Sequence, residues 1–144
     1  MTALDHIGLS VADLDAQRDW YVEAFGLVAS APFELAALGI RGVFVVHPGQ
    51  GWAIELLSRT GSRPGPRAAD PPGALLTQGY GHLCLRVEDV DAVYDRLVAA
   101  GAASRMPPGE SPEPGVRMAF VADPEGHLIE LLDRPSPVGG PEAE

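Results

Sequence analysis

Hydrophobic and polar residues alternate along two short stretches of the chain, 4–11 and 80–87. Because successive side chains of a strand point to opposite faces, each stretch predicts a strand with one apolar face. Apolar residues at helical spacing follow both stretches and predict helices over roughly 14–25 and 90–100. An aspartate stands at the N-cap position of each predicted helix: Asp13 and Asp89.

Three more strand-like segments follow each predicted helix, so the unit is βαβββ, written twice. In the first half they cover roughly 27–35, 41–47 and 52–58, and in the second half roughly 103–106, 116–122 and 127–133. The proline-rich run PPGESPEPG, between the first two segments of the second half, is typical of a loop. The pattern therefore predicts an α+β fold in which each helix covers the apolar face of its own sheet.

Two blocks of sequence recur at almost the same offset. LDHIGLSVADLDA and YGHLCLRVEDVDA share six of thirteen residues at an offset of 76, and GWAIELLSR and GHLIELLDR share six of nine at an offset of 75. This internal repeat predicts two βαβββ modules, 1–60 and 78–135. The intervening residues 61–77, rich in Pro and Gly, are expected to form a linker, and 136–144 a disordered tail.

Composition narrows the class of partner. The 144 residues carry a net charge of −10, and all ten cationic side chains are Arg. Such acidity argues against nucleic acid or an anionic membrane surface as a partner. The single Cys84 excludes an intramolecular disulfide, and no signal peptide or apolar span is recognisable, so we expect a cytoplasmic protein.

One histidine and one glutamate recur on the polar face of both predicted sheets. Glu55 and Glu130 each lie within an IELL run, while His6 and His82 share the polar face of the first strands. An isolated carboxylate among apolar residues is costly to bury, so it is expected to be paired, protonated or bound to metal. A single histidine or glutamate of this kind is equally typical of a position that faces solvent. Because the pattern is repeated, it favours four ligands around one divalent metal ion, Zn, Ni, Co, Mn or Fe.

The four blocks LDHIGLSVADLDAQRDWYVEAFGL, GWAIELLSR, GYGHLCLRVEDVDAVYDRLVAAGA and FVADPEGHLIELLDR resemble the vicinal oxygen chelate superfamily. This superfamily comprises glyoxalases, bleomycin resistance proteins and dioxygenases. The resemblance implies that two βαβββ modules form a cupped mixed sheet with the helices outside, and that the protein is a homodimer. It also implies that the metal ligands are His6, Glu55, His82 and Glu130.

The ligand set is similar to that of bacterial glyoxalase I, and methylmalonyl-CoA epimerases often carry Gln where this chain has Glu55. The resemblance thus implies a metal-dependent lyase, isomerase or epimerase that abstracts a proton next to a carbonyl and forms a metal-stabilised enediolate. Glu130 is the first candidate for the base and Glu55 the second. Two alternatives stay open: an extradiol-type Fe(II) dioxygenase with three protein ligands, and a metal-free protein that binds a drug or metabolite.

Two departures from the epimerase pattern are visible. Epimerases commonly have a His-His pair in the second module, where this chain has His82-Leu83. They also use a second acid on a middle strand of the first module, whereas LGIRG at 38–42 contains none and Glu34 is the nearest carboxylate.

Overall fold

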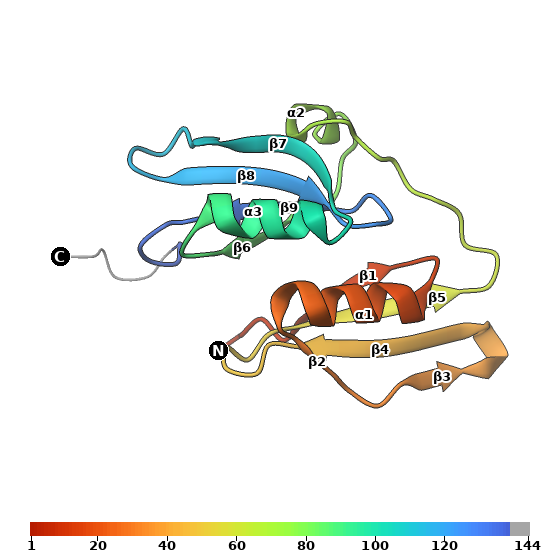
Figure 1. Cartoon of the computed structure of the whole chain (residues 1–144). Coiled ribbons are helices and arrows are strands. Elements are labelled where there is room, and N and C mark those ends of the chain that lie inside the picture. The colour runs from red at the N-terminus through yellow and green to blue at the C-terminus, as the bar shows by residue number, and fades with distance from the viewer. Residues whose placement is uncertain (139–144) are drawn as a thin grey trace. The chain divides into compact units, whose positions relative to one another are not determined.

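The computed structural model describes residues 1–138 and divides the chain into two compact units, unit 1 over residues 1–65 and unit 2 from Pro66 onwards (Figure 1). Each unit combines a mixed β-sheet with one long helix, which confirms the predicted α+β class. No helix within residues 1–138 is long and apolar enough to cross a membrane.

Unit 1 contains a five-stranded sheet in the order β1-β5-β4-β2, with β3 also paired to β4. β1 runs parallel to β5, and the other pairs are antiparallel. The elements are β1 His6–Ser10, α1 Leu14–Phe25, β2 Val28–Ala29, β3 Phe33–Leu35, the 3-10 helix η1 Ala36–Leu38, β4 Ile40–Val46 and β5 Ala53–Arg59.

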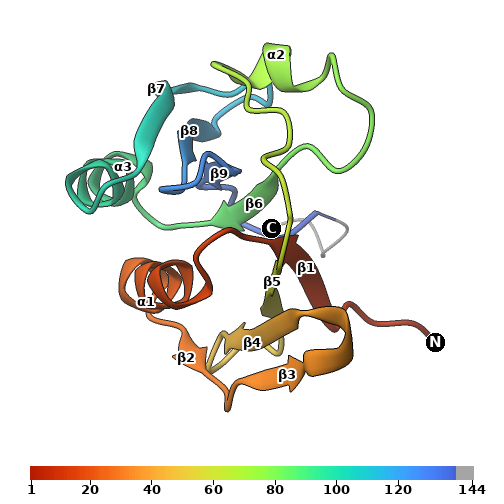
Figure 2. The same cartoon turned by 90° about the vertical axis from the view of Figure 1, so that its right-hand side faces the viewer.

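Helix α1 has the bounds that its sequence predicts, because both of its ends are specified locally. The Asp13 carboxylate accepts a hydrogen bond of 3.0 Å from the backbone N–H of Ala16, and Gly26 takes up the left-handed conformation at φ 64°. The helix contacts β4 and β5. Figure 2 shows α1 and α3 (Val90–Ala99) each on one side of its own sheet. The buried side chains of α1 are Leu14, Gln17, Tyr21 and Ala24.

Unit 2 repeats this plan with a four-stranded sheet in the order β6-β9-β8-β7, in which β6 and β9 are parallel. The Asp89 side chain caps α3 as Asp13 caps α1, through a 3.0 Å hydrogen bond from the Ala92 N–H. The elements are α2 Pro71–Ala74, β6 Leu83–Arg86, α3 Val90–Ala99, β7 Ala103–Glu110, β8 Arg117–Ala122 and β9 Leu128–Leu132.

Two predicted segments differ from the structure. The single strand predicted over 27–35 is split into β2 and β3, and the break includes Pro32, whose nitrogen cannot donate to a ladder. The loop predicted from Pro107 onwards is wrong over its first four residues, because β7 continues to Glu110. β7 lies at the edge of the sheet and its pairing with β8 shifts register on both sides of Met106, which is where a sheet tolerates proline.

In the sequence between β5 and β6, residues 61–70 form neither helix nor strand. α2 begins after Asp70, whose carboxylate accepts a 2.7 Å hydrogen bond from the Gly73 N–H. Of the tail predicted over 136–144, residues 139–144 lie outside the described residues.

Candidate metal centre

In unit 1, the parallel pairing of β1 with β5 brings His6 and Glu55 together. Gly8 is the register partner of Glu55, and His6 lies two residues earlier on the same face of β1. Nε2 of His6 lies 3.4 Å from Oε2 of Glu55. A Cβ at Gly8 would lie 3.9 Å from Oε2 of Glu55, an ordinary van der Waals contact.

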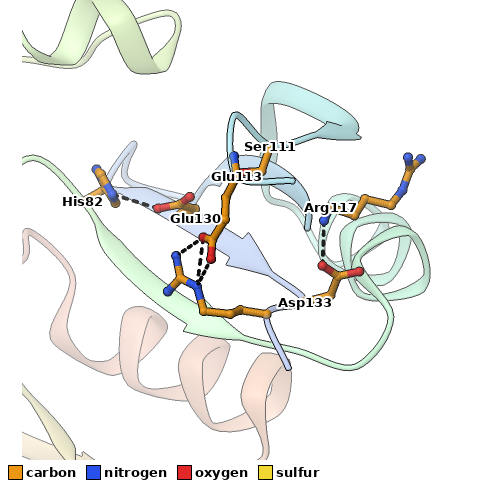
Figure 3. Close-up of polar contacts among 7 residues, drawn as sticks. His82, Ser111, Glu113, Arg117, Glu130 and Asp133 are labelled. Carbon is orange, nitrogen blue, oxygen red and sulfur yellow. Dashed lines mark hydrogen bonds and ion pairs between the residues drawn. The ribbon is translucent and has the colours of Figure 1, made fainter. Parts of the chain in front are cut away.

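In unit 2, the same register brings His82 and Glu130 together. Cys84 is the register partner of Glu130 in the parallel β6–β9 pair, and His82 again lies two residues earlier. Nε2 of His82 lies 3.0 Å from Oε2 of Glu130 (Figure 3). The repeat in the sequence is therefore also a repeat of one side-chain arrangement.

Both glutamates are partly shielded while their neighbours are fully buried. The Glu55 side chain is 22% exposed and that of Glu130 is 16% exposed. The flanking Ile54 and Leu56 are almost completely buried on the opposite face of β5, as the alternation predicts. Each histidine–glutamate pair therefore lies on the sheet face away from the helix, where a small molecule can reach it.

A phenylalanine packs against each of these histidines, and this feature was not identified from the sequence. The rings of His6 and Phe44 meet edge to face at 5.2 Å and 85°, and those of His82 and Phe120 at 5.3 Å and 80°. Phe44 and Phe120 are the register partners of Glu55 and Glu130. They also lie at an offset of 76, so extending the repeat comparison to β4 and β8 reveals them.

The two histidines differ in the partner of their second ring nitrogen, Nδ1. Nδ1 of His6 lies 2.6 Å from Oδ1 of Asp5, and this hydrogen bond is the main reason that the pKa of His6 is raised above its ordinary value. The residue before His82 is Gly81, which offers no such partner. Asp5 thus fixes the ring of His6 with Nε2 directed toward Glu55, the role that an outer carboxylate has for many metal-binding histidines.

Cys84 shares the face of His82 and Glu130, but its thiol is a weak nucleophile. Cys84 is exposed on this face, but partial withdrawal of its thiol from water, and then the neighbouring Glu130, raise the pKa of Cys84 to about 12. The thiol therefore stays protonated at neutral pH, and a protonated thiol is a poor nucleophile.

The remaining histidines belong to turns. Nδ1 of His47 accepts a 3.1 Å hydrogen bond from the Gly49 N–H. Nδ1 of His127 lies 2.7 Å from the buried carboxylate of Asp123, which also accepts hydrogen bonds from the backbone of Glu125 and His127. Burial of the ring acts against protonation, but the hydrogen bond and charge of Asp123 outweigh it and raise the pKa of His127.

The donor atoms of the two pairs lie at ion-pair distance, and this spacing is also compatible with a shared metal ion. Two ligands that each lie ~2.1 Å from one ion, at an angle between octahedral and tetrahedral, are ~3.0–3.4 Å apart. The separations of 3.4 and 3.0 Å fall in this range. Within residues 1–138 no group of three or more His, Cys, Asp or Glu side chains has an arrangement that could hold a metal ion, so the pairs supply two candidate ligands per unit.

A family model described as the glyoxalase/bleomycin resistance protein/dioxygenase superfamily matches residues 3–131. The chain belongs to this superfamily. The resemblance of the four sequence blocks is thereby confirmed.

Relatives within the superfamily carry two kinds of name. A probable lactoylglutathione lyase of Vibrio cholerae is 30% identical over 129 residues, which cover 88% of this chain and 87% of that protein. An ethylmalonyl-CoA/methylmalonyl-CoA epimerase of Cereibacter sphaeroides is 33% identical over 103 residues, which cover 69% of this chain and 71% of that protein.

Solved structures share the fold. Glyoxalase I from Zea mays matches with a TM-score of 0.72 at 23% identity, over 92% of this chain and 45% of that chain. This chain therefore spans less than half of the maize protein, and at this identity the match supports the architecture alone.

Proposed function

We propose that the protein is a metal-dependent isomerase, epimerase or lyase that removes a proton from a carbon next to a carbonyl group. The single observation that supports it best is the repeated pair, imidazole Nε2 beside carboxylate Oε2 at 3.4 and 3.0 Å. Relatives named as a lyase and as an epimerase, at 30% and 33% identity, support the same class.

In this proposal His6, Glu55, His82 and Glu130 together hold one divalent ion, chosen from Zn, Ni, Co, Mn and Fe. When bound, such an ion supplies a positive charge that stabilises negative charge developing on the carbonyl oxygen of the substrate. Imidazole and carboxylate ligands together would suit all five metals.

The chain itself supplies the base. Glu130 accepts the proton at a carboxylate oxygen. In an isomerisation it returns the proton to the neighbouring carbon, whereas in an epimerisation the same carbon is protonated again from its opposite face. Glu55 is the second candidate for the base. Glu130 is the first candidate by the resemblance to glyoxalase I, and its side chain is the less exposed of the two, 16% against 22%. Phe44 and Phe120 limit the rotation of the two imidazoles while the proton moves.

The proposal also includes a small-molecule substrate, a homodimer and a cytoplasmic location. The net charge of −10 supports a substrate that is not a nucleic acid. Sedimentation of the untagged protein tests the dimer.

Metal content of the untagged protein, measured by mass spectrometry, tests the proposal first. We expect about one ion per chain in the wild type, and a loss of the ion in His6→Ala and His82→Ala. The exposed Glu23 of α1 provides a matched control, since Glu23→Gln removes a carboxylate on the helix, which covers the sheet face opposite His6 and Glu55. Wild-type protein that takes up none of the five metals would refute the metal site and favour a protein that binds a drug or metabolite.

The base is tested with Glu130→Gln after metal loading. We expect this variant to retain metal but to lose exchange of solvent deuterium into the substrate, assayed with the hemithioacetal of methylglyoxal and glutathione and with methylmalonyl-CoA. Undiminished exchange would exclude Glu130 as the base, and Glu55→Gln tests the second candidate in the same way. Cleavage of a catechol by the Fe(II)-loaded protein would instead favour the dioxygenase.

A further inference from the structure

Strand β5 carries two charged groups on one face, four residues apart. Glu55, Leu57 and Arg59 alternate with Ile54 and Leu56, which are buried beneath α1. Residues i and i+4 of a strand are separated by about 13 Å. A molecule that reaches the histidine–glutamate pair of unit 1 and extends along β5 therefore arrives at Arg59.

A cavity of about 360 Å³ connects these two groups within unit 1. Its walls are largely apolar, and Glu55 and Arg59 both line it. The apolar lining residues come from β3, β4 and β5: Phe33, Leu35, Ile40 and Leu57. This volume is sufficient for one small organic molecule but not for a folded partner.

The guanidinium of Arg59 has no carboxylate partner among residues 1–138. Arg41, the nearest other cation on the neighbouring strand, points to the opposite face, where it lies 3.6 Å from Asp15. Arg59 is therefore the cationic group that lines the cavity.

The repeat shows what an arginine at this position binds. Arg134 is the counterpart of Arg59 at an offset of 75. In unit 2 its Nε lies 3.1 and 3.0 Å from the two carboxylate oxygens of Glu113, which belongs to the segment between β7 and β8 (Figure 3). In unit 2 a carboxylate of the chain itself thus pairs with the arginine at this position, whereas Arg59 has no such partner within residues 1–138.

We propose that Arg59 binds the carboxylate of a ligand whose apolar segment fills the cavity of unit 1. The planar guanidinium suits a carboxylate, and the apolar lining of the cavity suits the rest of the ligand. Resting on the proposed function, this defines the substrate class: an organic acid in which an apolar segment separates the carboxylate from the carbon that loses its proton.

The test uses 4-phenylbutyrate as the anionic probe and 4-phenylbutanol, its neutral analogue, on the full chain in the presence of a chelator. Binding is followed through backbone amide shifts in NMR spectra, with Phe33, Ile40 and Leu57 as reporters. We expect the acid to bind wild-type protein about tenfold more tightly than the alcohol, which is the range of one charge-assisted hydrogen bond. Arg59→Gln is expected to abolish this difference, while Arg63→Gln, a matched change outside the cavity, preserves it.

Equal affinity for the acid and the alcohol, an unchanged affinity in Arg59→Gln, or shifts confined to other residues would each overturn the inference. A lack of detectable binding of both probes to wild-type protein would overturn it as well. Because the titration is free of metal, its result is independent of the metal site. Protein that binds the acid but no metal refutes the proposed function alone, and the reverse refutes the role of Arg59 alone.

Discussion

Replacing Gly42 with alanine is expected to lower the free energy of unfolding of unit 1 by about 1–3 kcal/mol, the usual effect of overpacking. Gly42 is buried in β4, and the ring of Phe33 from β3 folds directly over its Cα. A Cβ at this position would lie 2.2 Å from Cζ of Phe33, and 2.6 and 2.8 Å from its two Cε atoms.

The magnitude follows from the displacement that the ring must make. Carbon atoms in contact are at least about 3.5 Å apart, so the ring has to move by about 1.3 Å. This movement disturbs its packing on Phe44, whose ring centre lies 5.9 Å away. Because Gly42 does not have a positive φ, no backbone strain adds to this effect.

Urea unfolding monitored by tryptophan fluorescence measures the change, since both tryptophans, Trp20 and Trp52, belong to unit 1. With a urea dependence of about 2 kcal/mol per molar, a loss of 2 kcal/mol lowers the midpoint by about 1 M. Gly65→Ala is the matched control, because a Cβ at Gly65 meets no atom within 4 Å.

A double-mutant cycle decides whether the ring is the cause. In a Phe33→Ala background, Gly42→Ala is expected to leave the midpoint within about 0.3 M of its parent, because the obstructing atoms are gone. An equal destabilisation in both backgrounds would refute the steric argument, as would a wild-type-like midpoint in the single variant.

Two predictions concern unit 2. The raised pKa of His127 beside Asp123 means that its protonated form stabilises the fold, so this contribution is present below about pH 6.5 and is lost as the pH rises through the folded pKa. Wild-type protein should therefore lose more stability between pH 5.5 and 8.5 than His127→Gln, measured by urea unfolding with circular dichroism; identical losses would contradict this. Because the pKa of Cys84 is raised to about 12, the folded protein should react with a disulfide reagent at pH 8 at least roughly tenfold more slowly than the urea-unfolded chain, and equal rates would contradict it.

The parts of the fold that local sequence specifies were predicted well. α1 follows its capping Asp13 and ends before Gly26. The alternation around Glu55 also places this residue on the face away from the helix. Burial at the sheet edge was less predictable. Ile7, on the apolar face of β1, is 42% exposed, because α1 packs on β4 and β5 and leaves the edge strand β1 open.

The candidate site also contains residues that the sequence predicted and residues that it did not. The repeat singles out the residues of the two pairs, because a residue kept in both copies has a shared reason. The packing of Phe44 and Phe120 on the histidines depends on strand register, which no local pattern specifies. The pairing of Arg134 with Glu113 could likewise not be predicted from the sequence, since it joins the end of a strand to a loop 21 residues away.

The two prolines of β7 have a consequence for assembly. Pro107 and Pro108 carry no N–H, so the free edge of β7 cannot complete a ladder with a strand from another molecule. Stacking of sheets from chain to chain, the route by which β-rich proteins polymerise into fibrils, is thereby obstructed at this end of the unit 2 sheet.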